Sequence, residues 1–323
     1  MSENLTVDGA AARPRAGQPR ADEPRVGLAA LEPRRKLQLA LAVVWLFDGI
    51  LQYQPSMFSG GFPRMLAGSA QGNPAVVAAP ITWSASFIDH HLVVVNAVFA
   101  TIQVALGLGI AWRPTVKLAL GASVAWALGV WWFGEGFGGV LTGTASPISG
   151  APGAVILYAV LAVLLWPADQ DVFAPFVAGR AVGRRLARLL WLVVWGSLAV
   201  FALLPAARMP RALSGIISSM APGEPSWLAW IDSRAASTLS HQGLVVSLVF
   251  AAAFVVVAAS VFLPVGPARS VLVLGIVIAA VLWLAQGMGG IFTGSGTDPN
   301  SGPLLALLAL AFWPVGVTSD AGA

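Results

Sequence analysis

Long apolar runs alternate with short polar or Gly- and Pro-rich stretches along most of this chain. A helix needs roughly 20 predominantly apolar residues to cross the hydrocarbon core of a bilayer. The fourth and eighth runs are shorter than the others, as expected for helices that begin inside the membrane after a Gly-rich loop. The pattern predicts eight transmembrane helices, over residues 37–57, 87–112, 117–137, 152–168, 187–207, 238–264, 270–288 and 303–318.

Much of this pattern occurs twice, at a spacing of 151 residues. The motif G-x-G-G-x-x-T-G at 136–143 returns at 287–294, and at the same spacing His90 falls on His241. A repeat of this length is typical of a duplicated folding unit, and an even number of spans in each unit makes the two units point the same way. The predicted fold class is therefore an all-α polytopic membrane protein with two parallel four-helix repeats.

The basic residues predict the orientation of the helices, because cytoplasmic loops of membrane proteins are enriched in Lys and Arg. Under the eight-helix scheme 14 of the 18 basic residues are cytoplasmic and both termini lie in the cytoplasm. No cleavable leader is expected, because the first apolar run begins only near Leu37 and is about as long as a full span. The predicted domains are a disordered basic tail (1–36), a first repeat (37–168), a cytoplasmic linker (169–186), a second repeat (187–318) and a C-terminal tail (319–323).

The two longest loops, 58–86 and 208–237, fall on the outer side in this scheme. Each contains a Pro-Arg start and a Pro-Trp stretch, and Trp is enriched where a membrane meets water. We expect interfacial helices in both loops, covering the outer mouth of the bundle.

Composition narrows the classes of protein. The chain is 57% hydrophobic and 10% charged, where soluble domains carry about 25% charged residues, so the lipid bilayer is the expected environment. A bacterial plasma membrane is the predicted location, and the basic residues lie in short blocks between apolar runs, which argues against binding of nucleic acid. The chain has no Cys, which excludes thiolate metal sites and thiol catalysis, and no hydrolase or nucleotide-binding motif is present.

Ionisable residues within predicted spans are candidates for function, because they are costly to bury in a membrane. Asp48 lies near the middle of the first span, on one helix face with Gln52. In the second span Asp89, Asn96 and Gln103 recur every seven residues and so are expected to share a face. If the two faces meet, they form a polar seam; the alternative is a neutral Asp48 that only packs against Gln103 or a helix carbonyl.

The end of the third span carries the last polar candidate, Glu135, which is followed by the Gly-rich motif. Its counterpart in the second repeat is Gln286, and the counterpart of Asp48 is apolar, around Leu198. This asymmetry suggests one working site in the first repeat, although neutral drift of a symmetric core gives the same pattern.

The Gly-rich motif lacks the Lys of a P-loop and follows a helix, whereas a P-loop follows a strand. It is expected to turn the backbone into the bundle, with threonines bonded to loop carbonyls and with Ser149 and the turn at 298–300 capping the helices that follow.

His90 and His241 are predicted to occupy equivalent outer ends of two spans. Symmetric imidazoles near a two-fold axis are able to ligate one haem iron or copper ion between them. The alternatives are that each His caps its helix at the membrane interface, or that it carries protons.

The segment Gln103–x3–Gly107–x–Gly109–x2–Trp112–Arg113–Pro114–Thr115–x–Lys117–x3–Gly121 resembles the DoxX-like membrane proteins. The resemblance covers roughly residues 37–167. It implies a four-helix unit, here doubled, of a kind sometimes associated with quinone or sulfur redox systems.

The sequence thus favours a protein that binds or transports a small solute or ion through an outward-facing polar cavity in the first repeat, and it is not expected to be an enzyme. The candidate ligand or proton residues are Asp48, Gln52, Asn96, Gln103 and Glu135, and the metal candidates are His90 and His241. Two alternatives remain open: a redox-associated accessory subunit holding quinone or haem, and a structural protein that assembles membrane partner proteins.

Overall fold

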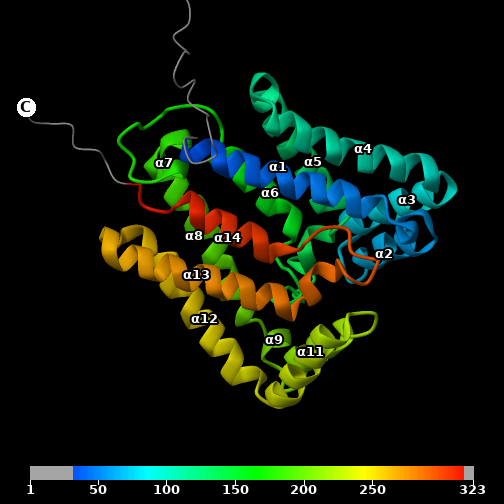
Figure 1. Ribbon diagram of the computed structural model, residues 1–323. Coiled ribbons are helices and arrows are strands. Elements are labelled where there is room, and N and C mark those ends of the chain that lie inside the picture. The colour runs from blue at the N-terminus through cyan, green and yellow to red at the C-terminus, as the bar shows by residue number, and fades with distance from the viewer. Residues whose placement is uncertain (1–31, 316–323) are drawn as a thin grey trace, which may run out of the picture. The chain divides into compact units, whose positions relative to one another are not determined.

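The computed structural model describes residues 32–315, and the described residues form helices connected by turns, without a strand. Residues 1–31 of the predicted basic tail, the predicted C-terminal tail and the last residues of the eighth span lie outside this range. The prediction of a disordered tail is wrong for residues 33–36, which belong to a helix. Residues 33–315 form one compact unit (Figure 1). The helices of its first half are α1 (Pro33–Gln52), η2 (Pro55–Phe58), α2 (Gly61–Ser69), α3 (Ala75–His90), α4 (Leu92–Ala111), η3 (Arg113–Thr115), α5 (Val116–Phe133), η4 (Gly136–Gly139) and α6 (Ala154–Leu164).

A short helix inside the predicted linker leads into the second half. The elements that follow α6 are α7 (Val177–Val182), α8 (Arg184–Ala202), α9 (Pro205–Arg208), α10 (Ala212–Met220), α11 (Ser226–Leu239), α12 (Gly243–Ala259), η5 (Ser260–Phe262), α13 (Val265–Ala285), η6 (Gly287–Gly290) and α14 (Ser301–Ala311). The starts of α1, α2, α3 and α4 are each followed, 151 residues later, by the start of a helix: α8, α10, α11 and α12.

Among residues 32–315, five helices are long and apolar enough to cross a membrane: α4, α5 with its preceding turn, α8, α12 with its following turn, and α13. Their outer faces carry large exposed apolar side chains, Val93, Leu118, Val249 and Val273 among them. Water would disfavour so much exposed apolar surface, whereas lipid accommodates it. The chain is therefore a helical membrane protein.

The two shorter apolar helices, α6 and α14, lie at the centre. They pack against each other, and most of their side chains are buried. On either side the same pairs of helices occur in both halves: α1 with α4 and α8 with α12, then α5 with α6 and α13 with α14. Figure 1 shows α14 (red) between α1 (blue) and α13 (orange), so helices from the two halves interleave at the core.

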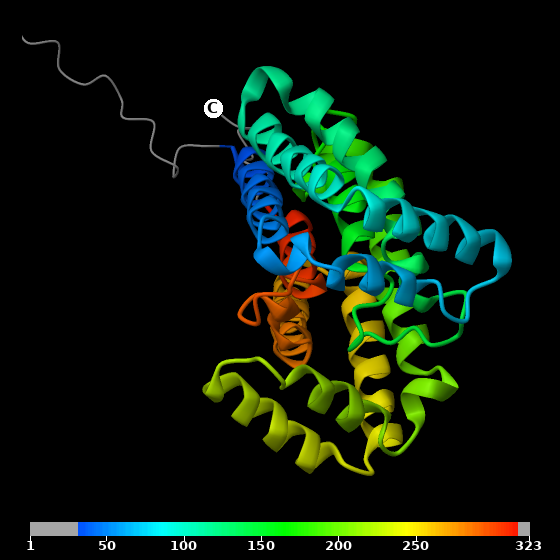
Figure 2. The same ribbon diagram turned by 90° about the vertical axis from the view of Figure 1, so that its right-hand side faces the viewer.

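The structure corrects two predicted spans. The run 87–112 is broken at His91, where α3 ends and α4 begins, and the run 238–264 is broken between α11 and α12, where His241 has a positive φ of 68°. Hydropathy alone merged the ends of α3 and α11 with the helices that follow, because only a few polar residues separate them from the apolar runs of α4 and α12. The two predicted loops, 58–86 and 208–237, contain helical hairpins, α2–α3 and α10–α11 (Figure 2).

Candidate functional site

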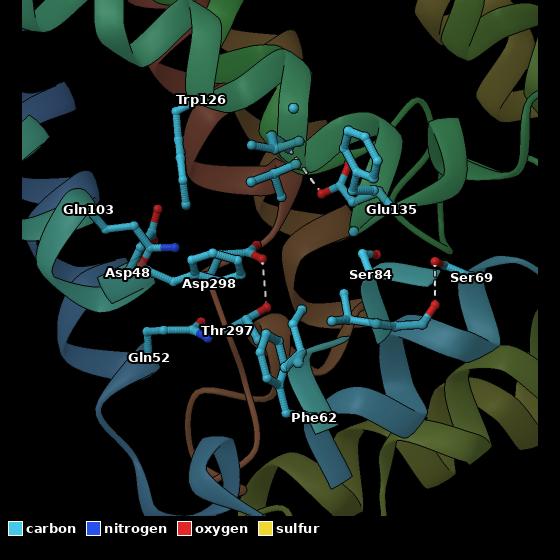
Figure 3. Close-up of a pocket in the computed structure, with 18 of the residues that line it drawn as sticks. Asp48, Gln52, Phe62, Ser69, Ser84, Gln103, Trp126, Glu135, Thr297 and Asp298 are labelled. Atoms are coloured by element: carbon cyan, nitrogen blue, oxygen red, sulfur yellow. Dashed lines mark hydrogen bonds between the residues drawn. The ribbon is translucent and has the colours of Figure 1, made fainter. Parts of the chain in front are cut away.

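A cavity of about 630 Å³ lies between α1, α2, α3, α4, α5 and α6, in the first half of the chain. Four of the five predicted ligand residues line it: Asp48, Gln52, Gln103 and Glu135 (Figure 3). Volumes of this order are typical of sites for small molecules. The walls are largely aromatic and aliphatic, and the aromatic residues are Trp45, Phe62, Trp83, Phe87, Phe99, Trp126, Phe133 and Tyr158.

Asp48 is the most deeply buried acid of the cavity, with 2% of its surface exposed. The apolar spacing of α1 turns Asp48 and Trp45 to the interior of the bundle. One carboxylate oxygen, Oδ2, accepts a hydrogen bond from the hydroxyl of Tyr158 on α6, and the other, Oδ1, has no protein partner. The Tyr158 ring packs on Trp45 with a centroid distance of 4.3 Å. Asp48 is therefore fixed from one side, and its second carboxylate oxygen is buried without a partner in the protein.

The polar faces of α1 and α4 meet beside the cavity. The Gln52 amide donates to Oδ1 of Asn96, and Nδ2 of Asn96 donates to the backbone carbonyl of Gln52 at 3.0 Å. Asn96 is fully buried behind Gln52 and does not line the cavity. Gln103 lines the cavity, and its Oε1 is buried without a partner. The amide of Gln103 is not hydrogen-bonded to Asp48, which was one of the predicted alternatives.

The predicted seven-residue stripe is wrong at Asp89, which is exposed on α3 because the helix breaks at His91.

The side chain of Glu135, which follows α5 in the sequence, reaches the N-terminus of α6. Its Oε1 accepts from the amide of Val155 at 3.2 Å, and its Oε2 is buried without a partner. A carboxylate is favourable there, because the first amides of a helix lack intrahelical partners. Gly153 has a φ of 110°, and a Cβ at this position would lie 2.0 Å from Oε2 of Glu135, so only glycine admits this arrangement. The prediction that Ser149 caps this helix is wrong, because its hydroxyl donates to the carbonyl of Ser146.

The loop before α14, in the second half, supplies a third acid to the cavity. Thr297 and Asp298 line the wall near Asp48 (Figure 3). Asp298 accepts hydrogen bonds from the amide of Asn300 at 2.6 Å and from the hydroxyl of Thr297 at 3.0 Å. Burial raises the pKa of Asp298 above its ordinary value. The Asn300 side chain caps α14 by accepting from Ser301, as predicted for this turn, but the role of Asp298 in the cavity was missed.

The corresponding space in the second half is nearly filled, with a cavity of about 20 Å³. Ser146, Pro147 and Ile148, from the loop before α6, lie against side chains of α10 and α12 there. Ser146 and Pro147 stand 151 residues before Thr297 and Asp298, so equivalent loops of the two halves each enter the other half. The position equivalent to Asp48 is Ala199, and no acid lines the second cavity.

The two predicted metal ligands are not brought together. His90 is exposed at the end of α3, where its Nδ1 lies 2.7 Å from the carbonyl oxygen of Ser86, and His241 is exposed before α12. The α3–α4 and α11–α12 junctions lie apart from each other in both views (Figures 1 and 2). Within residues 32–315 no group of three His, Cys, Asp or Glu side chains is placed to hold a metal ion.

The Gly-rich motifs form the tight turns that the sequence predicts. Both copies contain glycines with positive φ, and Thr142 and Thr293 each donate to the carbonyl three residues earlier, at 2.9 and 2.7 Å. The first copy leads from α5 past Glu135 toward α6 and thereby sets one wall of the cavity.

In comparisons with known proteins, no family model, curated protein or solved structure matches this chain.

Proposed function

We propose that this chain is a plasma-membrane protein of eight spans, built from two parallel four-helix halves with both termini in the cytoplasm. Beside the five long apolar helices, α1, α6 and α14 supply the other three spans in this scheme. The spacing of 151 residues between the starts of four pairs of corresponding helices and the distribution of basic residues support it. The α2–α3 and α10–α11 hairpins then lie on the outer side.

The function we propose is binding of a small solute in the cavity of the first half, as the recognition step of uptake or export. One observation carries this proposal: Asp48 is buried with an unpartnered carboxylate oxygen beside a cavity of about 630 Å³. A buried polar atom without a partner is costly, so its position at a cavity wall favours a ligand that satisfies it. Binding of a donor at Asp48 favours the ionised carboxylate, which links occupancy of the site to protonation.

The absence of Cys from the sequence makes a clean test available. Ala125 and Ser84 line the cavity, whereas Ala162 is fully buried in the core of α6. We expect A125C and S84C to react with a small membrane-impermeant thiol reagent applied to the outside of intact cells, and A162C to remain unlabelled. Cavity cysteines that react no faster than A162C would overturn an outward-facing site, and labelling only in inside-out vesicles would reverse the orientation.

A second candidate, the redox-associated accessory role, is favoured by one further observation. Trp126 Nε1 is a buried donor without a partner at the cavity wall, and a quinone carbonyl is a suitable acceptor. The described residues that line the cavity include no His, so they supply no axial imidazole for haem. An absorption spectrum and solvent extraction of the detergent-purified protein separate the candidates: stoichiometric quinone supports the accessory role, and a cofactor-free protein supports solute binding.

A further inference from the structure

The polar groups of the cavity are unbalanced in favour of acceptors. Three buried oxygens have no partner, Asp48 Oδ1, Gln103 Oε1 and Glu135 Oε2, against one unpartnered donor, Trp126 Nε1. Buried acceptors are stabilised only by donors, so a complementary ligand must bring N–H or O–H groups. A ligand with acceptors alone would leave most of this wall unsatisfied.

The charges of the cavity are unbalanced in the same sense. Asp48, Glu135 and Asp298 all line it, and none of the described lining residues is Lys, Arg or His. A buried carboxylate needs a positive partner or strong donors to remain ionised. A cationic ligand provides both, whereas an anionic ligand provides no positive partner for any of the three acids.

The spacing of the acids and the nature of the walls distinguish an organic cation from a metal ion. Among residues 32–315 these acids do not form a group able to ligate one ion, and a metal ion requires several oxygens within about 2.6 Å. The rest of the surface is largely aromatic and aliphatic: Trp126 and Phe99 pack edge to face at 5.2 Å, and Trp83 stacks on Phe87 at 5.6 Å. Aromatic faces attract ammonium groups and also bury an apolar body.

We propose that this cavity takes a protonated amine carried on an apolar body about the size of an aromatic ring, with Asp48 and Asp298 determining specificity. The inference rests on the proposed function and names the chemical class of its ligand. The amine is placed between the first and second halves of the chain, because Asp298 belongs to the loop before α14. The apolar body lies against the aromatic walls formed by α3, α4 and α5.

The test compares three probes of similar shape: 2-phenylethylammonium, the neutral 2-phenylethanol and the anionic 3-phenylpropanoate. A primary alkyl amine is protonated at pH 7, like the side chain of lysine. Each probe is titrated against thiol labelling of A125C, with tryptophan fluorescence as a second readout, since Trp45, Trp83 and Trp126 line the cavity. We expect the amine to protect at a concentration about tenfold lower than the alcohol, and the carboxylate not to protect.

Two variants and one matched control complete the test. D48N and D298N remove a charge while keeping an amide oxygen as acceptor, so each should weaken protection by the amine about tenfold and leave protection by the alcohol unchanged. D89N removes a charge from an exposed position of α3 and should change neither.

The outcomes separate this inference from the proposed function. Protection by the alcohol or the carboxylate at concentrations equal to the amine overturns the amine class and leaves a binding cavity. Equal loss of amine and alcohol binding in D48N and D298N overturns their role in specificity. A cavity cysteine that is labelled and that no probe protects overturns the inference, and one that is never labelled overturns both proposals.

Discussion

The hydroxyl of Tyr158 provides a direct test of how Asp48 is held. The hydroxyl of Tyr158 on α6 donates a hydrogen bond to Oδ2 of Asp48 on α1. The two residues are 1% and 2% exposed, so this hydrogen bond joins the two helices inside the bundle. Replacing Tyr158 with Phe deletes one oxygen and keeps the ring that packs on Trp45 at 4.3 Å. Because Oδ1 of Asp48 already lacks a partner, Y158F leaves the entire carboxyl without a protein partner.

Two contributions set the size of the effect. Hydrogen bonds between membrane helices contribute about 0.6 kcal/mol on average and up to about 1.7 kcal/mol. Leaving a buried polar group without any partner costs about 1–3 kcal/mol in general. The second contribution dominates, because nothing else in the protein bonds to this carboxyl. We therefore expect Y158F to lower the free energy of unfolding by about 2 kcal/mol.

Unfolding of the purified protein by SDS in mixed micelles, followed by tryptophan fluorescence, measures this difference. Tyr53 offers a matched control: its hydroxyl bonds to Thr101 at 3.0 Å, but the residue is 49% exposed. Y53F should change the free energy of unfolding by less than about 0.5 kcal/mol, as is usual for surface substitutions. An equal effect of Y158F and Y53F would refute the argument, because Asp48 would then be satisfied by another group, such as water in the cavity. In Y158F/D48N the two substitutions should not be additive, since they share one interaction.

Three further predictions concern the frame of the cavity and the second half. E135A should destabilise the protein by about 1 kcal/mol relative to E135Q in the same SDS titration, because Gln retains the acceptor for the first amides of α6. G136A should prevent folding, measured as loss of monodisperse protein, because φ is +54° and a Cβ would lie 2.4 Å from a backbone oxygen; G129A has open space and should fold normally. Burial and the neighbouring Asp232 raise the pKa of Glu224 to about 7. The folded state therefore holds a proton at Glu224 that the unfolded state releases near pH 4.5, so the contribution of this group to stability should fall as the pH rises through 4.5–7, and E224Q should remove that contribution.

The sequence predicts most of the helices because apolar runs are an unambiguous signal of membrane helices. It does not predict where a run is divided. His91 ends α3 and begins α4 in an otherwise continuous stretch, so the two helices appear as one, and the seven-residue spacing from Asp89 to Gln103 acquires a meaning that the structure does not support. Local composition does not reveal this break, because it depends on how the α2–α3 hairpin packs against α4 and α5.

The first-half residues of the cavity were predicted for a physical reason that holds generally. Asp48, Gln52 and Gln103 are polar within apolar helices, and such residues face the interior of a bundle. Asp298 was not predicted as part of the site, because an acid in a Gly- and Pro-rich turn has many ordinary uses, and the turn does cap α14. Tyr158 was missed because a single hydroxyl in the apolar run of α6 carries no signal of its own.

The reciprocal placement of the two loops explains why the halves differ while sharing a frame. Each loop before α6 or α14 enters the opposite half, so a change in one loop alters the cavity of the other half. In the second half Ser146, Pro147 and Ile148 nearly fill the space, and Gln286 donates to the carbonyl of Pro147 at 2.9 Å. In the first half the corresponding loop leaves about 630 Å³ open and contributes Asp298. The second half is thus more than a scaffold, because it provides one of the three acids and part of the wall of the candidate site.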